Sequence, residues 1–224
     1  MRRAYRASST FLASRAFLLG RFRGSGPDGR VRPMVRRSIQ KCLERPVIPV
    51  AWDAGKDLEL LGRASSVFLQ GGALADLERV LNQFREWPQV ALFAHIDLIA
   101  GLDNSEAGVE YLAKFDRLSG LVTVHHHLAK PARRLGLLSI VRLFITDSRA
   151  VERGLAVASK SGADAIEILP AVAAVAVADD FKASPLPRIA GGLCRSEADV
   201  RQALDSGCRA VTSTRAVLWR LNDR

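Results

Sequence analysis

Residues 188–213 read RIAGGLCRSEADVRQALDSGCRAVTS and contain one complete strand–helix–strand unit. Two short apolar runs, Arg188–Ala190 and Ala210–Ser213, flank a segment whose apolar residues have helical spacing. Ser196 followed by an acidic residue three positions later is typical of a helix N-terminus, and Ser206-Gly207 is typical of a helix C-terminus. Because adjacent parallel strands need a crossover connection, this stretch predicts a parallel sheet.

The same alternation of apolar runs and helical stretches begins after Pro46. Helical spacing recurs in Leu74–Glu86, Ser105–Phe115 and Arg149–Ser161. Eight units favour closure into a small (β/α)8 TIM-type barrel, and a doubly wound open sheet is the alternative. The body is short for such a barrel, so we expect some connecting helices to be shortened, as in Lys130–Leu135. The predicted strands are Val47–Trp52, Ser66–Gln70, Val90–Leu98, Leu121–Val124, Leu138–Phe144, Ala165–Leu169, Arg188–Ala190 and Ala210–Ser213.

The excess positive charge of the chain is confined to its N-terminus. The net charge is +10, yet residues 1–45 carry twelve basic and two acidic residues, and residues 46–224 carry 21 of each. A neutral body excludes binding of nucleic acid by bulk charge of the whole barrel. We therefore expect a basic arm over residues 1–33 and a single barrel domain over residues 34–224.

Three interpretations of the arm remain open. In the first, translation starts at Met34 or the arm is disordered. In the second, the arm binds RNA phosphates. In the third, it is an Arg-rich and Ser-rich targeting sequence. No apolar run has the length needed to cross a bilayer. Cys42, Cys194 and Cys208 form no CxxC pair, so we expect neither a zinc site nor disulfides, but thiols in a reducing cytoplasm.

Polar residues gather where the predicted strands end, which is where a TIM-type barrel carries its chemistry. Alternation along the third strand places His95 and Asp97 on the inward face. There they could hold a cation, bind a ligand hydroxyl or transfer protons. Glu167 also faces inward, and a buried carboxylate needs a partner. Arg142 is its natural partner, unless a ligand anion binds Arg142 instead.

The last two strands end in residues suited to an anion. Gly191 and Gly192 follow the seventh strand, and Ser213 and Thr214 end the eighth. Glycines allow backbone N–H groups to approach a phosphate, and hydroxyls add donors, so this corner predicts a phosphate site. The tract His125–His127 follows the fourth strand, but neighbouring residues face opposite ways. We therefore expect no metal there, and only His125 at the barrel mouth.

Five segments, in order along the chain, resemble the glycerol-3-phosphate-responsive antiterminator family of bacteria. The resemblance covers Pro46 to Trp219. It implies a cytoplasmic regulator and not an enzyme. Such a regulator binds glycerol 3-phosphate and then acts on leader mRNA of glycerol-uptake genes to prevent premature termination. The segments are His95–Gly101, Arg142–Ser148, Glu167–Pro170, Ala190–Leu193, and Val211–Thr214 with Leu218-Trp219.

The resemblance also assigns roles and shows departures. It implies a phosphate corner at Gly191, Gly192, Ser213 and Thr214, and polar mouth residues at His95, Asp97, Arg142 and Glu167, with no cofactor beyond the ligand. The family often carries basic residues where this chain has Trp52 and His125, and Pro-Gly where it has Pro170-Ala171. The loss of two cations predicts weaker anion binding or a changed ligand.

Two further functions fit the residues. One is an isomerase, aldolase or phosphodiesterase acting on a small phosphorylated substrate, with acid–base groups at the mouth but no lysine at a strand end for a Schiff base. The other is a phosphate sensor that binds a protein. Because the body is neutral, RNA contacts are expected from the arm or from Lys130, Arg133 and Arg134. A homodimer is compatible with the sequence.

Overall fold

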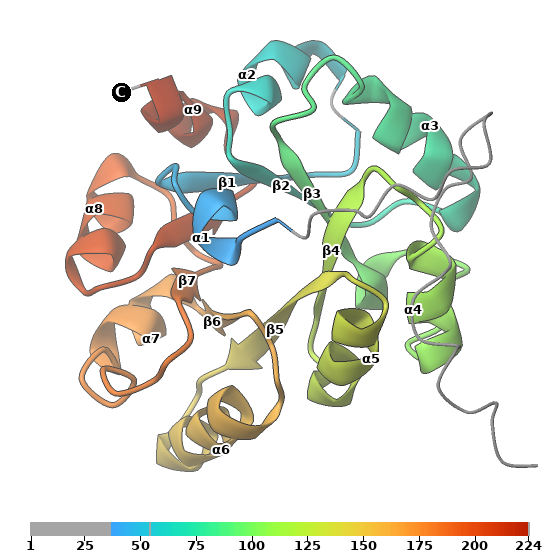
Figure 1. The fold of residues 1–224 in the computed structure, drawn as a ribbon. Helices are drawn as coiled ribbons and strands as arrows, with labels where there is room; N and C mark the ends of the chain where they lie inside the picture. Colours follow the sequence, from blue (N-terminus) through green and yellow to red (C-terminus); the bar gives the residue numbers. More distant parts are fainter. Residues whose placement is uncertain (1–36, 54, 224) are drawn as a thin grey trace, which may run out of the picture.

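A computed structural model describes residues 37–53 and 55–223, so the predicted arm over residues 1–33 lies outside the described residues. Eight parallel strands form a closed barrel in chain order, with β8 paired to β1 (Figure 1). The predicted TIM-type barrel is confirmed, and the open sheet is wrong. The strands are β1 (Val47–Ala51), β2 (Ser66–Leu69), β3 (Ala91–His95), β4 (Leu118–Thr123), β5 (Leu138–Phe144), β6 (Ala165–Leu169), β7 (Arg188–Ala190) and β8 (Ala210–Ser213).

Helices surround the barrel, and most are short, as the size of the body predicts (Figure 1). None of the described helices is both long and apolar enough to span a bilayer. The α-helices are α1 (Ile39–Cys42), α2 (Leu58–Gly62), α3 (Leu77–Gln83), α4 (Glu106–Leu112), α5 (Ala129–Arg134), α6 (Ser148–Lys160), α7 (Ala171–Ala176), α8 (Glu197–Asp205) and α9 (Ala216–Trp219). The 3-10 turns are η1 (Gly55–Asp57), η2 (Leu74–Asp76), η3 (Ile96–Leu98), η4 (His126–Leu128) and η5 (Arg220–Asp223).

Local signals set the helix ends as expected. The Ser196 hydroxyl accepts a hydrogen bond from the Asp199 backbone N–H, and the Asp199 carboxylate accepts from the Ser196 N–H, which completes the capping box of α8. Gly162 and Gly207 follow α6 and α8 with φ of +74° and +92°, a conformation that glycine adopts at little cost.

The third strand is shorter than predicted. It ends at His95, and Asp97 lies in η3 and not on the strand. The reason is that the Asp97 carboxylate accepts hydrogen bonds from the Thr123 hydroxyl at 2.7 Å and the Val124 backbone N–H at 2.8 Å. These bonds hold the chain in a turn toward the end of β4.

Two apolar layers stabilise the barrel. A large one lies between the strands and the helices, and a smaller one fills the interior. Helix α1 lies across the N-terminal end of the barrel, in front of the opening in Figure 1, and Ile39, Cys42 and Leu43 join the interior cluster there. Phe93 and Phe68 pack within the same cluster, with ring centroids 5.6 Å apart. The interior is thereby closed at its N-terminal end.

Candidate ligand site

An ion pair lies inside the C-terminal end of the barrel. Arg142 on β5 and Glu167 on β6 are register partners, and the Arg142 Nε donates to Glu167 Oε2 at 2.7 Å. Glu167 is fully buried, and the Thr212 hydroxyl donates to its Oε1, also at 2.7 Å. The partnership predicted from the alternation is confirmed. Both oxygens of the buried carboxylate are therefore satisfied, as burial requires.

Gly191 leaves room for the side chains of this ion pair. A Cβ at this position would lie 2.4 Å from Glu167 Oε1 and 2.7 Å from the Thr212 hydroxyl. The Gly191 N–H donates to the Ile168 carbonyl at 2.9 Å and so is not available to an anion. This differs from the role that the sequence suggested, because the extension of the strand pairing beyond β7 takes up that donor.

We expect Gly191→Ala to lower the free energy of unfolding by about 1–3 kcal/mol, because the added methyl group overpacks the buried carboxylate and hydroxyl. Urea denaturation measures the change. Gly154→Ala in α6 is the matched control, since its Cβ would meet the tip of the Phe181 ring at 3.0 Å and alanine favours a helix. Equal losses in the two variants would contradict the close approach at Gly191.

Backbone N–H groups without partners line the opening beside the ion pair. Gly192 and Leu193 adopt φ of +73° and +58°, and within residues 37–53 and 55–223 their N–H groups and that of Thr214 have no hydrogen-bond acceptor. Successive N–H groups in such a turn form a concave site for an anion. The Ser213 hydroxyl accepts from the Arg215 N–H at 3.2 Å, and the Ser213 carbonyl accepts from the Trp219 indole at 2.8 Å. These bonds fix the second side of the corner.

The corner and the ion pair share one cavity of about 160 Å³. Cavities for drug-sized ligands have roughly 300–1,000 Å³, so this one suits a smaller molecule. The cavity thus brings the predicted phosphate corner to Arg142 and Glu167. Its lining residues are Val50, Gln70, Arg142, Glu167, Leu169, Gly192, Leu193, Cys194, Thr212, Ser213 and Thr214.

His95 is buried in the barrel with unused hydrogen-bonding atoms. It is 1% exposed, and neither ring nitrogen has a hydrogen-bond partner among the described residues. Its Nδ1 lies 3.5 Å from Asp97 Oδ2. Burial, followed by the positive charge of Arg142, lowers the pKa of His95 to about 4. The imidazole is therefore neutral near pH 7, and it does not itself line the cavity.

The other predicted mouth residues surround this cavity without lining it. Asp97 is held by β4 through the bonds described above, and His125 Nε2 lies 3.9 Å from Asp97 Oδ1. Trp52 follows β1 and packs against Gly72, where a Cβ would lie 2.0 Å from the indole. These three residues follow β1, β3 and β4, at the same end of the barrel as the cavity.

The predicted RNA-contact residues lie elsewhere. Lys130, Arg133 and Arg134 are exposed on α5, and Arg134 forms an ion pair with Glu106 of α4. None of the three lines the cavity. Among the described residues no group of three His, Cys, Asp or Glu side chains is arranged to hold a metal ion.

Sequence reasoning missed six residues of the cavity, two of which, Gln70 and Thr212, contact the ion pair through their side chains. Gln70 follows β2, and its Oε1 lies 3.5 Å from Arg142 Nη2. Thr212 binds Glu167. Thr212 has the same alternation as the buried Ala210, which was a usable signal for an inward side chain. Nothing in the sequence near Gln70 indicates its contact with Arg142.

A closed barrel of eight parallel strands with helices between them, and a small pocket at the C-terminal ends of its strands, defines a TIM-type barrel with a candidate ligand site. More specifically, the chain belongs to the glycerol-3-phosphate responsive antiterminator family, whose model matches residues 47–219. It is thus a member of a family of regulators.

Solved structures agree with this family. The glycerol uptake operon antiterminator regulatory protein of Listeria monocytogenes is similar with a TM-score of 0.70 and 28% identity, over 78% of this chain and 95% of that chain. A glycerol uptake operon antiterminator-related protein of Thermotoga maritima is similar with a TM-score of 0.70 and 26% identity, over 79% of this chain and 98% of that chain. The uncharacterized protein YgcP of Escherichia coli is 28% identical over 80% of this chain and 93% of its own length.

Proposed function

We propose that this protein is a glycerol-3-phosphate-responsive, RNA-binding antiterminator of glycerol-uptake genes, without catalytic activity of its own. The observation that carries the proposal is the shared cavity, in which unpartnered N–H groups of two strand-end loops lie beside Arg142. A protein of this kind acts on transcripts as they are made, so its place is the cytoplasm.

The phosphate is held by the loops that follow β7 and β8. The N–H groups of Gly192, Leu193 and Thr214 donate to its oxygens, with the hydroxyls of Ser213 and Thr214 beside them. The Arg142 guanidinium supplies the positive charge that offsets the anion, since it also lines the cavity. The absence of basic residues at Trp52 and His125 therefore leaves one cation at the centre of the site.

The glycerol hydroxyls meet neutral polar groups, one that lines the cavity and one that is buried in the barrel within the electrostatic influence of Arg142. Gln70 lines it and can donate or accept. His95 keeps an imidazole without partners, and its lowered pKa leaves one nitrogen as an acceptor. Ligand hydroxyls would satisfy such buried atoms, whose desolvation is otherwise uncompensated.

Thermal unfolding with glycerol 3-phosphate, glycerol or inorganic phosphate tests the ligand. Only glycerol 3-phosphate is expected to stabilise strongly, by about 2.7 kcal/mol at a hundredfold excess over the Kd. Thr214→Asp places a carboxylate at the corner and should abolish this shift. Thr146→Asp, an exposed site after β5, should keep it. Equal stabilisation by phosphate alone would count against the proposal.

The catalytic alternative rests on two buried ionisable residues, His95 and Glu167. Glu167 is held by Arg142 and Thr212, an arrangement that suits a structural partner of the ligand site and not a proton carrier. Incubation with triose and sugar phosphates decides between the two. Turnover that His95→Ala abolishes would establish an enzyme.

A further inference from the structure

The two ends of the barrel differ in charge. Segments that lead into the strands lie at the N-terminal end, and they carry ten basic and seven acidic residues. Segments that leave the strands lie at the mouth, and they carry three basic and six acidic residues. The first set is 37–46, 63–65, 84–90, 113–117, 135–137, 161–164, 177–187, 206–209 and 220–223; the second is 52–53, 55–57, 70–76, 96–105, 124–128, 145–147, 170, 191–196 and 214–215.

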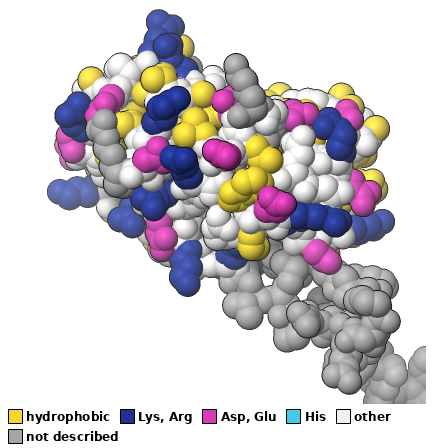
Figure 2. All heavy atoms as spheres, turned by 90° about the horizontal axis from the view of Figure 1, so that it is seen from above, with side chains coloured by type: hydrophobic (Ala, Val, Ile, Leu, Met, Phe, Trp, Pro, Cys, Tyr) yellow, Lys and Arg dark blue, Asp and Glu magenta, His cyan; other side chains and the backbone are white. Residues whose placement is uncertain are grey.

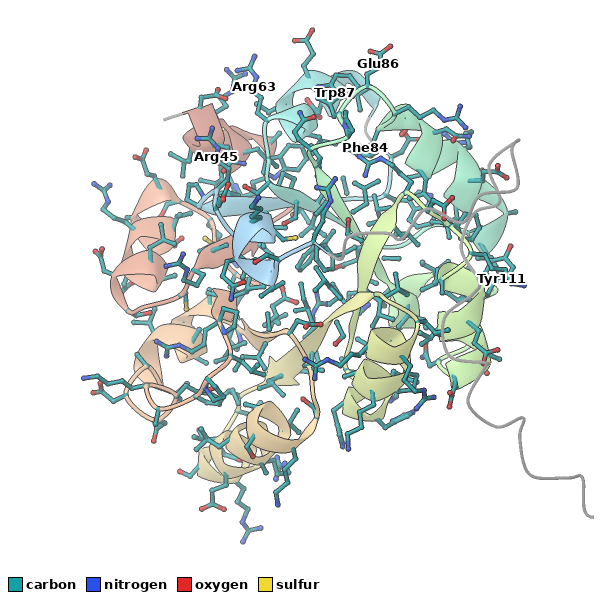
Figure 3. The ribbon with its side chains drawn as sticks, in the orientation of Figure 1. Arg45, Arg63, Phe84, Glu86, Trp87 and Tyr111 are labelled. Atoms are coloured by element: carbon teal, nitrogen blue, oxygen red, sulfur yellow. The ribbon has the colours of Figure 1, made fainter. Side chains whose placement is uncertain are left out.

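A large basic cavity opens at the N-terminal end. It measures about 850 Å³, and four cations line it, namely Arg37, Lys41, Arg45 and Arg63. Figure 3 shows Arg45 and Arg63 near α9 and α2. Two acids also line the cavity, Glu44 and Asp223, and Asp223 pairs with Arg63 at 3.0 Å. The balance of charge in the cavity is therefore positive.

Two guanidinium groups at this end donate hydrogen bonds to backbone carbonyls. Arg37 donates to the carbonyls of Pro88 and Gln89. Arg117 donates to those of Phe84, Trp87 and Val90, and burial together with the charge of Arg37 lowers the pKa of Arg117 to about 10. Carbonyl acceptors hold the side chains in place without cancelling their charge.

Further positive charge precedes this end of the barrel in the sequence. Residues 1–36 contain nine arginines and one acid, Asp28, and they join the barrel at Arg37. The flank beside α2 and α3 has basic and acidic side chains interspersed (Figure 2). The excess of positive charge is thus a property of the N-terminal end and not of the flank.

The mouth has the wrong chemistry for a polyanion. Besides its acidic excess, it carries three of the seven exposed large apolar side chains of the described residues, and three more lie within two residues of its segments. A phosphate backbone is bound by arginine and lysine, and such a rim offers it little. The three are Leu98, Val124 and Leu193, and the three nearby are Phe144, Val172 and Val217.

From these observations we infer that RNA binds at the N-terminal end of the barrel, over α1 and the basic cavity, at the opposite end from the ligand pocket. That RNA is the partner rests on the proposed function. The location of its binding site is inferred from the charge asymmetry and the basic cavity. RNA phosphates lie on Lys41, Arg45 and Arg63.

This location requires the ligand to act at a distance. Val50 lines the ligand cavity and belongs to the interior cluster that also contains Ile39, Cys42 and Leu43 beside α1. A contiguous packed column thus joins the two ends. Ligand changes RNA affinity to the extent that it binds differently to two states of this column.

Fluorescence titration of the full chain with a short labelled single-stranded RNA, from about 50 to about 200 mM salt, tests the location. The triple variant Lys41→Gln, Arg45→Gln, Arg63→Gln should weaken binding by roughly tenfold or more, and reduce the salt slope by about 0.7 for each phosphate that is no longer neutralised. The matched control, Arg149→Gln, Arg195→Gln, Arg215→Gln, removes three exposed charges on the mouth side and should bind as the parent does.

The outcomes separate the inference from the proposed function. Suppose that the parent binds RNA, but the Lys41, Arg45 and Arg63 variant binds it as tightly as the parent does. This result would overturn the location alone, whether or not the control variant on the mouth side binds more weakly. No RNA binding by the parent at low salt would overturn both. Poly-glutamate that displaces RNA from the parent at equal charge would show a site for an acidic protein segment and would also overturn the inference. Thermal unfolding of both triples checks that they fold.

Discussion

Replacing Glu167 with glutamine is expected to lower the free energy of unfolding by about 3–5 kcal/mol. The fully buried carboxylate accepts the Arg142 Nε at 2.7 Å, and it is the only acid in ion-pair contact with that guanidinium among the described residues. Glutamine keeps the shape but leaves a largely buried cation without its counter-ion. Urea denaturation should show the loss, and the Tm should fall by roughly 2–4 °C per kcal/mol.

Two controls identify the cause. Asp53→Asn removes the partner of the exposed Arg79, 2.9 Å away, and should change stability little because water screens that pair. The double variant Arg142→Met, Glu167→Leu should recover much of the loss, since apolar side chains remove the unpaired charge. A double variant as unstable as Glu167→Gln would show that the cost has another origin than the stranded guanidinium.

The barrel could be predicted from the sequence because its signals are local. Period-two alternation in the β6 run placed Glu167 on the inward face, and Arg142 on the preceding strand was then its natural partner, which the register of the two strands confirms. Glycines after helices and the capping box of α8 set the boundaries. Each of these features needs only a few consecutive residues.

Much of the ligand cavity could not be predicted, since it depends on contacts across the barrel. Gln70 on the β2 side contacts Arg142 on β5, which is 72 positions further along the chain. The role of Gly191 depends on the position of the Glu167 carboxylate, and not on a glycine motif. Asp97 lies outside the predicted strand because its carboxylate accepts hydrogen bonds from Thr123 and Val124. Such partners are set by barrel closure and register.

Under the proposed function and the inferred RNA site, the placement of charge would allow one small barrel to bind two anions. The ligand cavity holds a single guanidinium beside free N–H groups, which suits one phosphate. The N-terminal end has many cations spread over α1 and the adjoining loops, which suits a polymer of phosphates. Because the packed interior separates them, neither anion competes directly for the site of the other.

Acidification is expected to destabilise the protein through His95. Burial and the charge of Arg142 lower its pKa from 6.5 to about 4, so between these values the unfolded chain binds a proton that the folded chain does not. The contribution to stability is complete above pH 6.5 and is lost as the pH falls to about 4. The loss is on the order of 3 kcal/mol. Urea denaturation at a series of pH values measures it.

The change in the free energy of unfolding with pH, and not the free energy at any one pH, shows whether His95 causes the effect. His95→Gln removes the titrating ring, so the fall between pH 6.5 and 4 should be smaller than in the parent by that amount. Equal slopes for the parent and His95→Gln would mean that the folded protein accepts the proton beside Arg142. The imidazole could then not offer the ligand a neutral acceptor at low pH.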